Sequence, residues 1–364
     1  RRECQYHGER CELRDTYPNS AARGQEWTTP RDLRYVSPDC HAGSATTVVA
    51  LPWAGCLYWP MRFQERPFSG ESHVRAMLDL VALSPRDNLH VVDLPYRFSS
   101  WALDDPRNAA LWMDSRGRLA AWAVLQTPFL AIDSAVRSGA EADLFSRVLD
   151  WADARASAVV GTLYARSTWY VHVFADQVER CRRLEQAGFA CQADVGEDSW
   201  SRVLLERTSA PPGVAPTPSG FTIRPLAGAS EVDAYVELHR AAFDSANMTG
   251  AWRERTLARP EYVRDIDLVA RAPDGRLAAF CVGWLLPEKQ AIGQIEPLGV
   301  GREFREAGLG RAILYENLRR LARLGAATVL VETDTYRSPA LDLYESAGFE
   351  PIRNIHVFRK DATG

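Results

Sequence analysis

The sequence predicts an α/β fold with a mixed α+β sheet, built twice along the chain. The first observation is an internal repeat: Gly117-Arg-Leu-Ala-Ala-Trp122 returns as Gly275-Arg-Leu-Ala-Ala-Phe280, 158 residues later. The second is a related pair of segments, Glu185-Gln-Ala-Gly-Phe189 and Glu345-Ser-Ala-Gly-Phe349, 160 residues apart. Because the anchors recur in the same order at a nearly constant offset, we interpret the chain as a duplicated domain. The third observation is that strand-like and helix-like segments alternate through the second copy.

Composition divides the chain into four parts. The segment from Met61 to Phe68 is typical of the first strand of a domain, and we expect Met61 to be the true start of the protein. Residues 1–60 are therefore predicted to be a non-native or disordered N-terminal extension. A degenerate copy over residues 61–207 follows. A proline-rich linker over residues 208–219 then leads to a second copy over residues 220–364.

In the second copy, hydrophobic periodicity and turn residues place the elements in order. Ser230 is predicted to cap the first helix. The predicted strands are Phe221–Arg224, Leu268–Arg271, Arg276–Leu286, Gln290–Val300 and Thr328–Glu332, with one or two more over Phe349–Phe358. The predicted helices are Ser230–Phe243, a broken segment from Trp252 to Arg264, Leu309–Leu324 and Pro339–Ala347.

The overall composition excludes several classes of function. The chain has 364 residues, enough for two or three domains. The formal net charge of −4 and the absence of a strongly basic stretch argue against a nucleic-acid partner. No apolar run approaches the roughly 18–20 residues that span a membrane, so we predict a cytoplasmic protein without a membrane partner. The cations are almost all Arg, with Lys only at 289 and 360, which is typical of a GC-rich bacterial genome.

The most informative stretch follows the predicted strand Gln290–Val300. It contains Arg305-x-x-Gly308-x-Gly310 and opens directly into a helical pattern. The first N–H groups of a helix have no internal partner and its dipole favours negative charge, so the turn is a predicted anion site. No Gly-Lys-Ser/Thr is present, and the third glycine of G-x-G-x-x-G would fall at Ile313. Both the triphosphate loop and the dinucleotide fingerprint are therefore excluded.

A strand, R-x-x-G-x-G and then a helix resembles the acetyl-CoA pyrophosphate loop of the GCN5-related N-acetyltransferase (GNAT) family. The resemblance covers residues 220–360 and, in weakened form, 61–207. It implies two tandem acyl-CoA N-acyltransferase-like domains and acetyl-CoA as co-substrate. The pantetheine arm would lie in a gap beside the central strand and pair with its backbone. The positions implied to contact acetyl-CoA are Leu298, Gly299, Val300, Arg305, Glu306, Ala307, Gly308, Leu309, Gly310, Arg311 and Arg337.

Two further residues are candidates for acid–base catalysis. Glu296 lies on the predicted central strand, where period two would place it on the face of Leu298 and Val300, and it is the candidate base. A bulge at Pro297 would change the direction in which the Glu296 side chain points. Tyr344 lies in a segment that resembles the family's A-x-x-L-Y-x-x-x-G-F helix, whose Tyr protonates the CoA thiolate. The alternatives are that Glu296 is a strand carboxylate paired with Arg, and that Tyr344 packs on the cofactor or in the core.

The sequence departs from the family pattern at two places. The family often has Asn seven residues before the Tyr, whereas this chain has Arg337, which could reach a phosphate instead. The first copy lacks the loop motif, and Glu141 and Asp143 stand in the first turn of its predicted helix, where two carboxylates repel a diphosphate. Leu184 occupies the position that matches Tyr344. We predict that the first copy is non-catalytic and supports the second copy or walls its acceptor site.

Several other residues are weaker candidates for a site. Cys4-x-x-His7-x-x-x-Cys11 is an incomplete zinc pattern, and no metal is predicted. Cys281 lies in mid-strand and is interpreted as a core thiol. The segment in which the family builds its acceptor pocket holds Asp244, Trp252 and Tyr262. The resemblance implies that any of them could contact the substrate, and core or surface roles stay open as alternatives.

The sequence therefore predicts an N-acetyltransferase. Acetyl would pass from acetyl-CoA to a primary amine of a small molecule by direct attack in a ternary complex, at a site in the second copy. The alternative is a non-catalytic acyl-CoA-binding regulatory or assembly module. A third option is an acyltransferase that uses a longer acyl-CoA. The oligomeric state is not predicted.

Overall fold

The computed structural model describes residues 63–193, 195–196, 199–208, 210, 213, 215–286 and 291–362. The predicted extension over residues 1–60, with its Cys4-to-Cys11 pattern, lies outside the described residues. The described residues belong to one compact unit, Trp59–Gly364. Among them, no helix combines the length and the apolar character needed to cross a bilayer.

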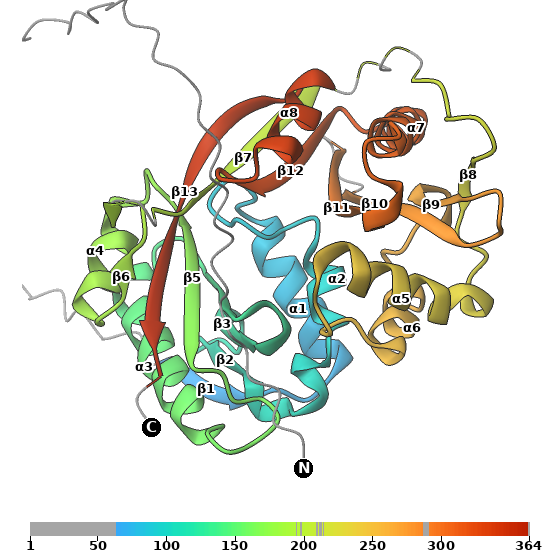
Figure 1. The fold of residues 1–364 in the computed structure, drawn as a ribbon. Coiled ribbons are helices and arrows are strands. Elements are labelled where there is room, and N and C mark those ends of the chain that lie inside the picture. The colour runs from blue at the N-terminus through green and yellow to red at the C-terminus, as the bar shows by residue number, and fades with distance from the viewer. Residues whose placement is uncertain are drawn as a thin grey trace, which may run out of the picture. The chain divides into compact units, whose positions relative to one another are not determined.

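One mixed sheet runs through both copies (Figure 1). Its strand order is β1-β2-β3-β4-β5-β13-β7-β12-β11-β10-β9-β8, and β6 pairs with β13 beside this path. The β4–β5 and β11–β12 pairs are parallel and the others antiparallel. The strands are β1 Gln64–Pro67, β2 Ala109–Met113, β3 Leu119–Gln126, β4 Ala131–Val136, β5 Thr168–Phe174, β6 Ala190–Cys191, β7 Ser201–Thr208, β8 Thr222–Pro225, β9 Asp267–Arg271, β10 Leu277–Leu286, β11 Ile292–Val300, β12 Thr328–Asp334 and β13 Glu350–Asp361.

Helices cover both faces of the sheet. The α-helices are α1 Glu71–Ala82, α2 Leu94–Phe98, α3 Glu141–Ala158, α4 Val178–Gln186, α5 Val232–Phe243, α6 Gly250–Leu257, α7 Leu309–Arg323 and α8 Ser338–Ser346. Short 3₁₀ turns are Trp101–Asp104, Pro106–Asn108, Thr127–Phe129, Ala229–Glu231, Arg264–Ile266 and Arg302–Phe304. Residues of α1, α2, α5 and α6 share one apolar cluster, whereas α3 and α7 lie in two others.

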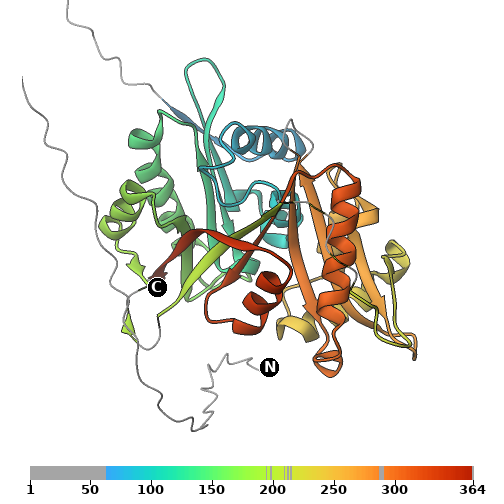
Figure 2. The same cartoon turned by 90° about the horizontal axis from the view of Figure 1, so that it is seen from above.

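The last strand of each copy pairs with the other copy. Strand β7, which ends the first copy, pairs antiparallel with β12 from Thr208 opposite Thr328 to Arg202 opposite Asp334. Strand β13, which ends the second copy, pairs with β5 of the first copy. Strands β7 and β13 also pair with each other, and they cross at the centre of the fold in both views (Figures 1 and 2). Each copy therefore completes its sheet with a strand from its neighbour.

The shared apolar cluster explains why the copies are held together. It joins Met77 of α1 and Tyr96 of α2 to Tyr235, Trp252 and Phe280 of the second copy, all of them buried. Fully burying a large apolar side chain is worth roughly 1.5–3 kcal/mol. Because both copies contribute to one cluster, neither can lose its neighbour without exposing these side chains to water.

The predicted elements of the second copy are largely confirmed. The strands and helices lie within a few residues of their expected bounds. The prediction that Ser230 caps the first helix was wrong, because α5 begins after Glu231 without a side-chain cap. The Glu231 carboxylate instead accepts from the Ala227 backbone N–H at 2.8 Å and pairs with Arg224. The second half of the broken helical segment is only the 3₁₀ turn Arg264–Ile266.

Candidate functional site

The parallel strands β11 and β12 pair only at one end. Ile292, Gly293 and Gln294 lie opposite residues 328–330, and beyond Gln294 no described residue of β12 pairs with β11. The backbone from Ile295 to Val300 therefore borders a gap in the sheet, and exposed backbone of this kind accepts an added strand. The predicted contact residues Leu298, Gly299 and Val300 lie on this edge. A Cβ at Gly299 would collide with the Phe280 ring, so a larger residue does not fit there.

A bulge interrupts β11 at Glu296 and Pro297. Along β10, Cys281 lies opposite Leu298, but Gly283 lies opposite Ile295, so β11 has one residue more than β10 in this stretch. The predicted bulge is confirmed. Its effect is that Ile295 and Leu298, three residues apart, both contact the cluster beneath α7. The register shift interrupts strict alternation at Pro297, and the expectation that Glu296 shares the face of Leu298 and Val300 stays a prediction.

The surroundings of Glu296 suit a base that works near neutral pH. Burial is the main cause that raises the pKa of its carboxyl to about 7, and the negative charges of Asp93 and Glu332 raise it further. Arg202 and Arg97 act in the opposite direction and lower the pKa. A carboxyl with this pKa is partly ionised at pH 7 and can both accept and release a proton there.

The turn before α7 presents a row of free backbone donors. Glu306 and Gly308 adopt positive φ angles of 64° and 77°, and the helix begins at Leu309. Within the described part of the chain, no acceptor bonds the N–H groups of residues 306–311. The first turn of α7 carries no acidic residue. Unpaired N–H groups at a helix N-terminus favour anions, so this turn has the backbone geometry that the predicted anion site requires.

The two arginines of this turn make contacts with the protein. Arg305 donates to the Ala242 carbonyl oxygen at 2.9 Å and to the Val300 carbonyl oxygen at 3.4 Å, which ties the turn to the end of α5. Arg311 donates to the Tyr315 hydroxyl at 3.2 Å. These bonds position the turn, and the free donors of the site are the backbone N–H groups of Glu306 to Arg311.

Tyr344 and Arg337 lie at α8, which follows β12. The Tyr344 ring is buried and packs edge-to-face with Phe349 at 5.8 Å between ring centroids. Burial, together with Cys281 and Glu296, raises the pKa of its hydroxyl, so the group stays protonated and able to donate at neutral pH. Arg337 pairs with Asp334, with 2.7 Å between Nε and Oδ2, and this contact was not predicted.

Helix α2 of the first copy contacts residues of α6 and β10 that adjoin Glu296, and these particular contacts were not predicted. The Trp252 indole N–H donates to the Tyr96 carbonyl oxygen at 3.1 Å. The Tyr96 ring lies 6.3 Å from that of Trp284, whose indole N–H donates to the Glu296 carbonyl oxygen at 2.7 Å. The first copy thus supplies part of the surroundings of Glu296. Tyr96 and Trp252 lie about 150 residues apart in the sequence, so no local pattern signals their contact.

The first copy keeps a gap but not the anion turn. Strands β4 and β5 pair only at Ala131 opposite Tyr170. The cavity beyond this pair is polar, with Asn88, His90, Asp133, His172 and Arg180 in its wall. Glu141 and Asp143 lie in the first turn of α3 as predicted, and Arg180 contacts Glu141. Two carboxylates therefore stand at the start of α3, where the second copy has no acidic residue.

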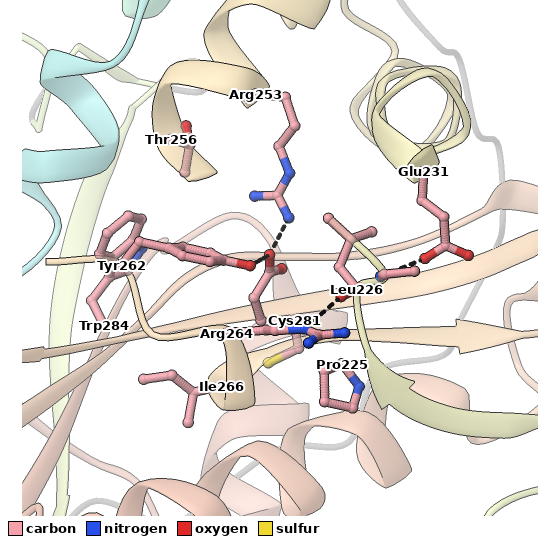
Figure 3. Close-up of polar contacts among 12 residues, drawn as sticks. Pro225, Leu226, Glu231, Arg253, Thr256, Tyr262, Arg264, Ile266, Cys281 and Trp284 are labelled. Carbon is pink, nitrogen blue, oxygen red and sulfur yellow. Dashed lines mark hydrogen bonds and ion pairs between the residues drawn. The ribbon is translucent and has the colours of Figure 1, made fainter. Parts of the chain in front are cut away.

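The structure also places the four remaining candidate residues. Cys281 is buried in β10 and burial raises the pKa of its thiol, so its interpretation as a core thiol is confirmed. Trp252 is buried against α2, and the Tyr262 hydroxyl donates to Asp267 at 2.7 Å (Figure 3). Asp244 is exposed at the end of α5, 3.8 Å from Arg302.

Residues 232–349 match the family model described as the Acetyltransferase (GNAT) family. Mycothiol acetyltransferase of Kineococcus radiotolerans is 36% identical over 162 residues, which cover 41% of this chain and 52% of the relative. Mycothiol acetyltransferase of Thermomonospora curvata is 31% identical over 135 residues, which cover 36% and 45%. The chain spans about half the length of the curated relatives it matches.

Solved structures share the fold. A GCN5-related N-acetyltransferase from Sphaerobacter thermophilus superposes with a TM-score of 0.59 at 22% identity, over 83% of this chain and 96% of that one. A tandem GNAT protein from the clavulanic acid biosynthesis pathway gives a TM-score of 0.58 at 17% identity, over 83% and 99%. Both similarities extend over the two copies.

Proposed function

Because residues 232–349 form a domain of the GNAT acetyltransferase family, we propose that the protein transfers acetyl from acetyl-CoA to a primary amine of a small molecule. The observation that carries the proposal is the combination of an open edge on β11 with free N–H donors at the start of α7. The open edge of β11 can form backbone hydrogen bonds with the amide groups of the pantetheine arm. The free N–H groups at the start of α7 can donate hydrogen bonds to the diphosphate of acetyl-CoA.

In this proposal two side chains move the protons. Glu296 accepts a proton from the acceptor amine, directly or through a water, and the free amine then attacks the thioester carbonyl carbon. The C–N bond forms and the C–S bond breaks. Tyr344 gives its hydroxyl proton to the departing sulfur. An acceptor that enters as an ammonium ion releases one proton to solvent in each turnover, because the product amide and the thiol keep the other two.

The first copy, in this proposal, walls the acceptor site. Helix α2 and its charged residues lie beside Glu296 and are far along the chain from the anion turn. The curated relatives are named mycothiol acetyltransferases, so an acceptor related to mycothiol belongs in the first assays. We also propose that the reaction needs no metal, and that the acceptor is a small molecule and not a nucleic acid.

The proposal is tested by titrating acetyl-CoA into the protein and into Gly308→Glu. Gly308 has a positive φ and open space around its missing Cβ, so the substitution places a carboxylate among the free N–H groups. Like charge repels the diphosphate, and we expect acetyl-CoA affinity to fall roughly 100-fold or more in calorimetry.

Gly325→Glu is the matched control for this titration. Gly325 also has a positive φ and open space, but it lies at the other end of α7. Its variant is expected to share the backbone strain and to keep acetyl-CoA affinity. Equal loss in both variants would contradict the assignment of the anion turn. Binding without turnover of any amine would instead support an acyl-CoA-binding module.

Tyr344→Phe is expected to lower kcat roughly 10- to 100-fold while acetyl-CoA affinity changes little. The ring keeps its packing against Phe349, and only the proton donor is lost. The measurement compares kcat for two acetyl thioesters, one whose thiol is a poorer leaving group and one whose thiol is a better leaving group. The loss is expected to shrink for the better leaving group. A loss that is the same for both would contradict the acid role.

A further inference from the structure

The bulge in β11 leaves Glu296 without a partner in the sheet. No residue of β10 lies opposite Glu296 or Pro297, because the register passes from Leu298 directly to Ile295. On the other side of β11, the pairing with β12 ends at Gln294 within the described part of the chain. Proline has no N–H group to donate to a neighbouring strand. The usual ladder of backbone hydrogen bonds therefore does not fix the direction in which the proposed base points.

Two side chains from outside β11 bond to the main chain at this bulge. The Trp284 indole N–H donates to the Glu296 carbonyl oxygen at 2.7 Å. Asn317 of α7 donates from Nδ2 to the carbonyl oxygen of Cys281, the residue of β10 at which the register shifts, at 2.8 Å. The same Nδ2 donates to the carbonyl oxygen of Ile266, just before β9, at 2.8 Å. Both donor side chains are buried, and their bonds stand where the bulge interrupts the ladder.

The two donors approach the bulge from opposite faces of the sheet. Trp284 belongs to the apolar cluster of α1, α2, α5 and α6, together with Phe280 and Val282. Cys281 lies between those two residues in β10 and belongs to the cluster beneath α7, the helix that carries Asn317. Alternating residues of a strand point to opposite faces. One face of the bulge is thus held by the cluster that joins the copies, and the other by the helix that follows the anion turn.

Gly283 leaves room for the Asn317 amide. A Cβ on Gly283 would lie 2.6 Å from Oδ1 of Asn317, which is shorter than real contacts of a Cβ atom. The Asn317 side chain is fully buried, and an amide is costly to bury unless its groups form hydrogen bonds. Its Nδ2 makes two such bonds, whereas its Oδ1 makes none among the described residues. The contribution of this buried amide is therefore its donor group, which holds β10 at the register shift.

The first copy provides an internal comparison. Over residues 121–126, β3 pairs with β4 without a register shift. The repeat offset of 158 residues places Leu125 and Gln126 where the second copy has Gly283 and Trp284. Nε2 of Gln126 is buried and has no acceptor among the described residues, and the buried residues of α3 are all apolar. The extra residue of β11, the room at Gly283 and the two donors thus occur together in the copy that carries the proposed base.

We infer that Trp284 and Asn317 are positioning residues, which hold the bulge in β11 and thereby aim the carboxyl of Glu296 at the acceptor amine. This inference rests on the proposed function and adds the residues that make its base effective. Neither side chain contacts a reacting group in this scheme. Trp284 acts through the carbonyl group of Glu296, and Asn317 acts through β10. A displacement of about 1 Å at a catalytic group can cost about 100-fold in rate, so these bonds are expected to matter for turnover.

Trp284→Phe and Asn317→Leu remove the donors and keep most of the packing. We expect each substitution to lower kcat/KM for the acceptor amine roughly 10- to 100-fold, because Glu296 loses its fixed direction. Acetyl-CoA affinity in calorimetry is expected to stay the same, since the anion turn is not changed. Rates are expressed per acetyl-CoA-binding site, so that unfolded protein does not contribute. Gly283→Ala is expected to act like Asn317→Leu, because its Cβ displaces the amide.

Combination with Glu296→Gln tests whether the two residues act through the base. In the Glu296→Gln protein, Trp284→Phe and Asn317→Leu are expected to change kcat/KM by less than about twofold, because the group that they direct is absent. A residue that only stabilises the fold would cause the same loss in both backgrounds. Equal losses in the parent and in Glu296→Gln would therefore overturn the inference and leave the base role of Glu296 intact.

Trp122→Phe and Leu318→Val are the matched controls. Trp122 is buried in the same apolar cluster as Trp284, and its indole N–H has no acceptor among the described residues. Leu318 is buried and follows Asn317 in α7, and its side chain has no hydrogen-bonding group. Both controls are expected to keep kcat/KM within about twofold of the parent. Controls that lose as much activity as Trp284→Phe and Asn317→Leu would show that packing is responsible, and would overturn the inference.

Hydrogen exchange separates this inference from the proposed function, because it needs no turnover. We expect the backbone of β11 to exchange faster in Trp284→Phe and Asn317→Leu than in the parent and the controls, measured by mass spectrometry of peptides that cover the strand. Faster exchange in a protein that acetylates no amine would refute the proposed activity and keep the two residues as supports of the bulge. Turnover of amines, with exchange and rates unchanged in both variants, would keep the activity and refute the inference.

Discussion

Glu296→Gln is expected to lower kcat/KM for the acceptor amine by roughly 100- to 10,000-fold, the range typical of a lost general base. The substitution keeps the size and a hydrogen-bonding end but removes the group that accepts the proton. In the parent protein, kcat/KM is expected to fall as the pH drops through about 7, because protonation of Glu296 removes the base. In the variant, the fall in kcat/KM that is caused by protonation of Glu296 is expected to disappear. The pH dependence that is caused by protonation of the acceptor amine is expected to remain. Initial rates across pH, at saturating acetyl-CoA, measure both effects.

Stability provides a second measurement on the same variant. The pKa of Glu296 is raised in the folded protein from an ordinary value of 4.5 to about 7. Stability from this group is therefore fully present below about pH 4.5 and is lost as the pH rises through about 7. Because Gln cannot ionise, Glu296→Gln is expected to unfold at an equal or higher temperature than the parent at pH 8.

Glu350→Gln is the control for these experiments, since Glu350 is exposed on β13. It is expected to leave the rate profile unchanged. A Glu296→Gln protein with normal acetyl-CoA affinity and a rate within a fewfold of the parent would exclude the base role. The raised pKa of Glu296 would then be a consequence of its burial beside Asp93 and Glu332.

The anion turn was predictable because its signals are local. Arg305-x-x-Gly308-x-Gly310 lies in one short segment, and the positive φ of Gly308 and the start of α7 follow from adjacent residues. The repeat likewise indicated which segments form strands. It could not indicate that β7 and β13 exchange between the copies, because strand pairing depends on contacts far apart in sequence.

The surroundings of Glu296 were not predictable for the same reason. Asp93 lies about two hundred residues before Glu296 in the sequence, and nothing near either residue signals the other. The bulge at Pro297 was foreseen from the proline, but its consequence for the alternation of β11 required the register with β10. Local sequence thus predicted the geometry of the turn before α7 better than the surroundings of Glu296.

Arg253→Met is expected to cause a large loss of stability. Arg253 of α6 and Asp267 at the start of β9 are both fully buried and form an ion pair. The Arg253 guanidinium also lies 3.8 Å from the centroid of the Tyr235 ring. Figure 3 shows Arg253 and Tyr262 pointing toward the same carboxylate. Removing Arg253 leaves a buried negative charge whose one remaining hydrogen-bond donor among the described residues is the Tyr262 hydroxyl, which costs about 3–5 kcal/mol.

The double variant Arg253→Met/Asp267→Asn distinguishes a charge effect from lost packing. If the uncompensated carboxylate causes the loss, removing it as well is expected to recover most of the free energy of unfolding, measured by urea denaturation. Arg276→Met, at an exposed pair with Asp274 and Glu303, is expected to leave the unfolding midpoint nearly unchanged. A double variant as unstable as Arg253→Met would mean that packing on Tyr235, not charge balance, holds α6 to the sheet. Because α6 carries Trp252, which bonds to Tyr96 of α2, either result also bears on how the first copy is held beside Glu296.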